Sequence, residues 1–267
     1  MITFLLGIVF RTSFLSSRKE FFTPVVIGIG FITSIFLVLG LPPILPTLSV
    51  DKIFYIATLG ILVGIIIDFL GSRKWWRLGF FIIFLTLAIY WITEPEGGFS
   101  NPWHILGLAI LWSGNILTLW KLEKSTTLVP SPIVKIFLVS LGLGLVAHIS
   151  EANDQRDLSF AIAATLLGYF ASNFSNVNQQ WNAVLLIGIQ SSILCVTASL
   201  AFYSTASLPA LAVLFLIYFS EESINVQDKN HGKLSSLIKS ATAIAIRTIP
   251  ILAALGLAFL GVRIDSF

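Results

Sequence analysis

The sequence predicts an all-α fold, a polytopic transmembrane helix bundle of about nine spans. Three observations support this prediction. The 267-residue chain is 56% hydrophobic and only 11% charged, with a mean hydropathy of +0.93, whereas about a quarter of the residues of a soluble domain are charged. Apolar runs of roughly 20 residues, the length that crosses a bilayer core, recur along the whole chain. Lys and Arg residues gather in alternate connections between these runs.

Charged residues, Pro, Gly and Asn bound the apolar runs and set the expected helix limits. We expect helices at about 22–47, 52–70, 76–93, 104–120, 133–149, 158–174, 181–202, 208–223 and 238–262. Their connections are short, so consecutive helices should be antiparallel neighbours in one domain that covers residues 1–267. Prolines 42, 43 and 46 should break the outer end of the first run, because proline cannot continue a helix. Pro132 and Pro209 suit the first turns of the helices that follow them.

Two segments are predicted to lie outside the spans. Residues 1–20 contain an apolar run that Arg11 interrupts, and we expect an interfacial helix there. A very short tenth span is the alternative for this segment. Residues 221–236 are polar and too few to form a domain, which predicts a cytosolic loop.

The distribution of basic residues predicts the orientation. All but three of the 16 Lys and Arg residues fall on one side of the predicted bundle, the exceptions being Lys52, Arg156 and Arg263. Basic residues near helix ends resist translocation, so that side should be cytosolic. The N-terminus is therefore expected in the cytosol and the C-terminus outside. The expected location is a bacterial cytoplasmic membrane or an organellar membrane.

Four polar residues fall inside predicted spans, in the half of the membrane nearest the cytosol. They are Asp68, Asn115, Gln190 and Arg247. A charged group at the centre of a membrane helix costs about 2.5–3.5 kcal/mol, so such residues need a reason to be there. If the four converge, they form a ligand-binding cluster for an anionic substrate or a lipid head group, because a guanidinium binds phosphate or carboxylate through paired hydrogen bonds.

Each of the four also has a simpler interpretation. Asp68 could pair with Arg73 or extend to the interface. Arg247 could be an ordinary basic flank, if the residues before it form an interfacial helix. Asn115 and Gln190 could tie neighbouring helices together through hydrogen bonds.

Gly60 and Gly64 have the spacing of small residues that lets two helices approach closely. Packing within the bundle is the first interpretation of this pair, and a homodimer contact is the alternative.

His148, Glu151, Asp154 and Asp157 follow one another at intervals of three on the outer side. Adjacent members could bridge a divalent cation, but the set rotates around a helix and cannot share one site. We interpret it as a solvated acidic turn in which Asp157 caps the next helix. No metal and no cofactor are expected, since the sequence has one Cys, three His and none of the common nucleotide, hydrolase or zinc motifs.

The sequence thus favours a non-enzymatic membrane protein, either a small permease or a membrane subunit of a larger complex. The alternative is a membrane-embedded enzyme that acts on a lipid-linked or isoprenoid phosphate at the cytosolic face, with Arg247 holding the phosphate and Asp68 as base or metal ligand. The expected partners are the lipid bilayer and further membrane subunits or a second copy of the chain. Nucleic acid is not expected, because the chain has neither a basic patch nor a soluble domain.

Overall fold

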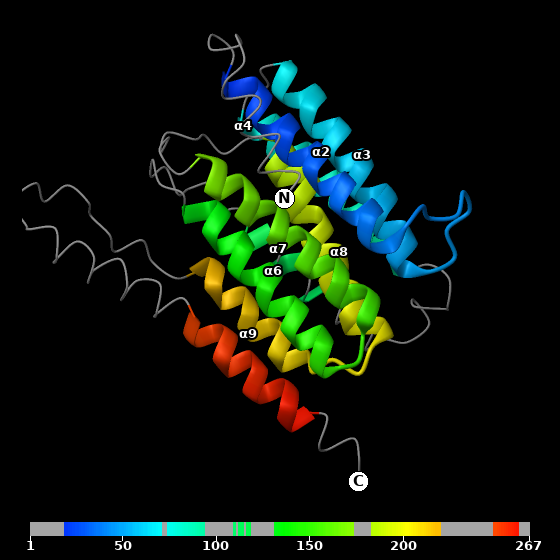
Figure 1. The fold of residues 1–267 in the computed structure, drawn as a ribbon, viewed down its shortest axis with the longest axis vertical. Helices are drawn as coiled ribbons and strands as arrows, with labels where there is room; N and C mark the ends of the chain where they lie inside the picture. The colour runs from blue at the N-terminus through cyan, green and yellow to red at the C-terminus, as the bar shows by residue number, and fades with distance from the viewer. Residues whose placement is uncertain are drawn as a thin grey trace, which may run out of the picture.

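The computed structural model describes residues 19–70, 74–93, 109–110, 112–114, 116–118, 131–173, 183–219 and 248–261. Every regular element in these ranges is helical, as predicted (Figure 1). The elements are α2 (Lys19–Leu39), α3 (Ser49–Phe69), α4 (Lys74–Thr93), α6 (Ser131–Ile149), α7 (Asn153–Asn173), the π-helix η3 (Val184–Gln190), α8 (Ser191–Tyr203), α9 (Leu208–Phe219) and a last helix (Thr248–Gly261).

One helix lies at the centre of the bundle. η3 continues directly into α8, and the two form a single element, Val184–Tyr203, that we call the central helix. In its most apolar 18-residue stretch, 94% of the residues are buried inside the protein. Helices α2, α3, α4, α6, α7 and α9 all contact it. A helix that is apolar all round lies either in a protein core or in lipid, and here the surrounding helices cover it.

The surrounding helices follow a fixed order. α4 packs beside α3, α3 beside α2, α2 beside α7, α7 beside α6 and α6 beside α9. The last helix contributes Ile251, Ala254 and Ala258 to the main apolar core. The short described stretches between 109 and 118 lie against α4, where the Trp112 indole N–H donates to the Thr86 hydroxyl at 3.0 Å.

The hydrogen bonds between helices define two ends of the bundle. At the Ser199 end, the hydroxyl groups of Ser49 and Ser199 are 2.9 Å apart and the Gln155 amide donates to Ser199 at 3.1 Å. At the Asp68 end, Asp68 bonds to the start of the central helix at Ala183. Accordingly α3 and α7 begin at the Ser199 end, where the central helix finishes. For α7 and the central helix, which follow one another in the chain, this antiparallel arrangement agrees with the expectation from short connections.

Most helix limits lie within a few residues of the predicted ones, with two instructive differences. α2 ends at Leu39, well before the predicted limit of 47, because Gly40 takes a left-handed conformation (φ +78°) and its N–H bonds back to the Phe36 carbonyl at 3.0 Å. α7 begins at Asn153, so the prediction that Asp157 caps this helix is wrong. Asp157 lies inside the helix and accepts a hydrogen bond from Arg156.

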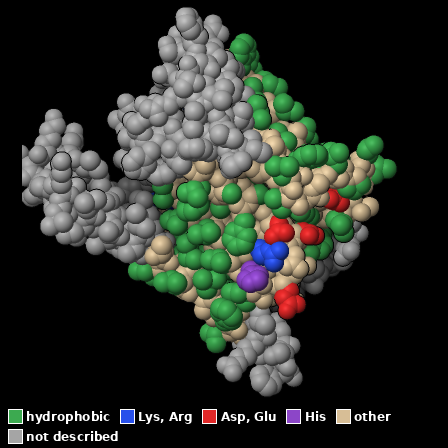
Figure 2. Space-filling model, viewed as in Figure 1, with side chains coloured by type: hydrophobic (Ala, Val, Ile, Leu, Met, Phe, Trp, Pro, Cys, Tyr) green, Lys and Arg blue, Asp and Glu red, His purple; other side chains and the backbone are tan. Residues whose placement is uncertain are grey.

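Several described helices are suited to a membrane. Ser49–Phe69, Trp76–Thr93 and Val184–Tyr203 are long and apolar enough to cross one, and Gly28–Leu39, Ile133–Ile149, Leu208–Phe219 and Thr248–Gly261 are shorter apolar helices. Many large apolar side chains are exposed, hydrophobic side chains are spread over the described part of the face in Figure 2, and the charged side chains visible there gather toward one side. These features indicate a membrane-embedded protein. The predicted cytosolic loop, and the predicted interfacial segment up to residue 18, lie outside the described residues.

Candidate functional site

Two glycines of α3 bring this helix into direct contact with η3. A Cβ atom on Gly60 would lie 2.6 Å from the Ile187 carbonyl oxygen, and one on Gly64 would lie 2.6 Å from the Val184 Cα. Both neighbours are backbone atoms, which cannot move aside as the end of a side chain can. The packing interpretation of this pair is therefore confirmed, with a contact inside the chain.

Asp68 lies one further step of four along the same stripe of α3, and its side chain reaches the start of the central helix. Its Oδ1 accepts the Ala183 backbone N–H at 2.9 Å, and its Oδ2 accepts the Val184 backbone N–H at 3.3 Å. The first N–H groups of a helix have no partner within the helix and carry a partial positive charge. Asp68 therefore caps the central helix from a different helix, and Arg77 of α4 adds a favourable charge interaction.

Two buried lysines interact with the C-terminal ends of other helices. Lys52, 5% exposed, donates its Nζ to the Trp91 carbonyl at 2.8 Å, in the last turn of α4. Lys135, 3% exposed, donates to the Tyr218 carbonyl at 3.4 Å, next to the last residue of α9. The final carbonyls of a helix carry a partial negative charge that an ammonium group stabilises.

Asp68, Lys52 and Lys135 thus share one role. Each is an ionisable group inside an apolar bundle, and each lies at a helix end whose partial charge is opposite to its own. Burying a charge without compensation is costly, and pairing with a helix end offsets that cost. The arrangement stabilises the fold and leaves these groups engaged with backbone atoms.

Gln190, at the end of η3, is the second candidate residue that the structure describes. It is fully buried, and its Oε1 accepts a hydrogen bond from the Tyr218 hydroxyl at 3.0 Å. The expectation that Gln190 ties helices together is confirmed, because Tyr218 belongs to α9. The Gln190 Nε2 has no hydrogen-bond partner. Among the candidate residues, this amide therefore has a donor free for a ligand or a water molecule.

The π-helical stretch next to Gln190 is stabilised by the two serines that follow it. Ser191 donates to the Ile187 carbonyl, and Ser192 donates to the Gly188 carbonyl at 2.7 Å. A π-helix shifts the backbone pairing by one residue and is frequent at functional sites. Here it also places Gly188 against Ile61 of α3, at a distance that allows no side chain.

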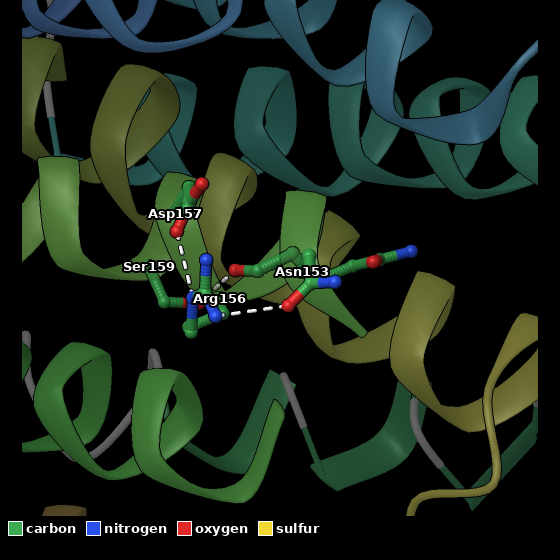
Figure 3. Close-up of polar contacts among 5 residues, drawn as sticks. Asn153, Arg156, Asp157 and Ser159 are labelled. Carbon is green, nitrogen blue, oxygen red and sulfur yellow. Dashed lines mark hydrogen bonds and ion pairs between the residues drawn. The ribbon is translucent and has the colours of Figure 1, made fainter. Parts of the chain in front are cut away.

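The Ser199 end holds polar groups of a different kind. The Arg156 guanidinium lies between Asp157, at 2.8 Å from Nε, and Asn153, at 2.9 Å from Nη1 (Figure 3). These three residues belong to the first turns of α7, and the hydrogen bond with Asp157 raises the pKa of Arg156. Within the described ranges, no group of three or more His, Cys, Asp or Glu side chains is placed to hold a metal ion.

Of the four predicted site residues, Asn115 and Arg247 lie outside the described residues. Asp68 and Gln190 both adjoin η3, but each is bonded to its own partner at a different level of that helix. Lys52 and Lys135 entered the predicted charge distribution only as basic residues on the two sides of the bundle, and neither was expected to bind a helix end. The spacing Gly60, Gly64, Asp68 was the one signal that could have placed Asp68 against another helix.

Comparison with known proteins adds no relative, since no protein family, curated protein or solved structure matches this chain.

Proposed function

We propose that this chain is a nine-span, non-enzymatic integral membrane protein that serves as a membrane subunit of a larger complex. Its N-terminus and the Asp68 end of the bundle face the cytosol, and the Ser199 end faces outward. The observation that supports the proposal is the closed interior of the part of the bundle that the structure describes. The central helix is buried on every side from residue 183 to residue 200, and glycine contacts hold it against α3.

The use of the buried charges also supports a structural role over catalysis. An enzyme acting on a lipid-linked phosphate would need Asp68 as a base or metal ligand. Both oxygens of Asp68 instead accept backbone N–H groups of the central helix. To act as a base or a metal ligand, this carboxylate would first have to give up contacts with the start of the central helix, which would leave backbone N–H groups there without a partner.

A small-solute permease is the second candidate, and the Gln190 amide favours it. A buried donor without a partner, beside a π-helix at the centre of a membrane bundle, could bind a polar solute during passage. Such a protein would have to move the central helix relative to α3 to open a path, because the described interior is closed.

Isolation of the tagged chain from its native membranes in mild detergent, followed by native mass spectrometry, tests the subunit proposal. We expect a complex in which the chain has a fixed stoichiometry with at least one different membrane protein. A monomer or homodimer carrying lipid alone would contradict it. Uptake of polar solutes into liposomes that contain only this chain, abolished by Gln190→Leu, would favour the permease instead.

A further inference from the structure

The connection between α2 and α3, residues 40–48, exposes an unusual amount of apolar surface. Four aliphatic residues of this α2–α3 loop are largely exposed, namely Leu41 (79%), Ile44 (92%), Leu45 (83%) and Leu48 (61%). The loop stands out from the end of α2 and α3 (Figure 1). Prolines 42, 43 and 46 restrict its backbone, so these side chains are displayed by a stiff segment.

The loop contrasts with the other turn at the same end of the bundle. Ser49, directly after the loop, and Gln155, in the first turn of α7, both bond to Ser199, so this loop and the turn at 150–152 share the Ser199 end. The region at 150–157 carries Glu151, Asp154, Arg156 and Asp157. The α2–α3 loop carries no charge, and the sequence has no Asp, Glu, Lys or Arg between Glu20 and Asp51. The turn at 150–152 is therefore suited to water, and the α2–α3 loop is not.

A hydrogen bond to α3 indicates how far the loop lies along the axis of the bundle. The Tyr55 hydroxyl donates to the Pro43 carbonyl at 2.9 Å. Side chains of a helix lean toward its N-terminus by up to about one turn, so Pro43 lies beside the first turns of α3 and not beyond its end. Tyr55 also packs against Trp91 of α4, with ring centroids 6.5 Å apart. Tyr and Trp gather at the level of the lipid head groups, which places the loop at that level.

We infer that the α2–α3 loop is a lipid-binding anchor, which inserts Leu41, Ile44, Leu45 and Leu48 into the outer leaflet of the bilayer. This inference rests on the membrane location and orientation proposed above. An uncharged segment that turns back to the level of the aromatic residues meets acyl chains just below the head groups. The same four side chains would be unfavourably exposed if the loop projected into water.

The depth of spin labels in lipid vesicles tests the inference. Single cysteines are introduced at Ile44, at Ile83 on the exposed side of α4, and at Asp154, in a Cys195→Ala background. Each label is then tested for collisions with oxygen, which concentrates in lipid, and with a water-soluble nickel chelate. We expect the label at 44 to favour oxygen several times over, as the label at 83 does, whereas the label at 154 favours nickel.

Three other results are possible, and each overturns the inference. A label at 44 that resembles the one at 154 would show that the loop lies in water. A label at 44 shielded from both reagents would show that protein covers the loop, either a second copy or another subunit. If the label at 83 also favours nickel, membrane insertion itself is wrong, and the proposed function fails with the inference.

Discussion

Removing the Asp68 carboxylate should release the start of the central helix. In Asp68→Ala, the backbone N–H groups of Ala183 and Val184 lose their acceptors inside the bundle. A hydrogen bond to a charged group contributes about 1.5–3 kcal/mol, and the contact at 3.3 Å is longer than a strong bond of this type. We therefore expect a loss of roughly 2–4 kcal/mol. Asp68→Asn keeps one oxygen acceptor without the charge and should cost about 1 kcal/mol.

The lone cysteine provides the assay. Cys195 is fully buried in the central helix, so a thiol-reactive dye reports the unfolding of the element that Asp68 caps. A change of 1 kcal/mol moves the melting temperature of a protein of this size by about 2–4 °C. We expect a decrease of roughly 5–15 °C for Asp68→Ala and a few degrees for Asp68→Asn. Asp154→Ala, which removes an exposed carboxylate from the start of α7, is the matched control and should change little.

One outcome would show that Asp68 does not stabilise the central helix. If Asp68→Ala melts within a degree of the unchanged protein while Gly64→Ala is strongly destabilised, close packing holds the central helix and the carboxylate does not stabilise it. Asp68 would then be available for a ligand, and the enzyme or transport interpretations would regain support.

Two further substitutions test the interior by the same dye assay. Gly64→Ala places a Cβ against the η3 backbone and should lower the free energy of unfolding by about 1–3 kcal/mol. Gly79→Ala, in open space on α4, should raise it by up to about 1 kcal/mol. Equal effects of the two substitutions would contradict the proposed contact. Tyr218→Phe leaves the buried Gln190 amide without its remaining partner and should cost about 1–3 kcal/mol. Adding Gln190→Leu should recover most of that loss, and no recovery would mean that the pair is not an isolated hydrogen bond.

The all-helical fold of the described residues could be predicted because the length of an apolar run is a strong signal. Short connections likewise predicted that neighbouring helices run in opposite directions. The errors arose from local hydrogen bonding. The end of α2 at Leu39 depends on the left-handed conformation of Gly40, and the start of α7 at Asn153 depends on how the turn before it closes.

The candidate site was harder to predict, because a polar residue in a span has the same sequence signature whether it binds a ligand or a helix end. Asp68 was identified as a residue that needs an explanation, but its partners are 115 and 116 positions away in the sequence. The periodicity of a sequence predicts contacts within one helix, and it does not predict a contact between residues so far apart. Lys52 and Lys135 were hidden for a related reason, since a basic residue near a helix end ordinarily extends into water.

The central claim is that the bundle crosses a membrane with the Asp68 end and the Ser199 end on opposite sides. Leu70→Cys and Asp154→Cys, each in a Cys195→Ala background, place one exposed thiol at each end. In right-side-out membrane vesicles, an impermeant maleimide should label Cys at position 154 at once and Cys at position 70 only after permeabilisation. Equal labelling of both positions in sealed vesicles, or recovery of the chain in the soluble fraction, would contradict the account.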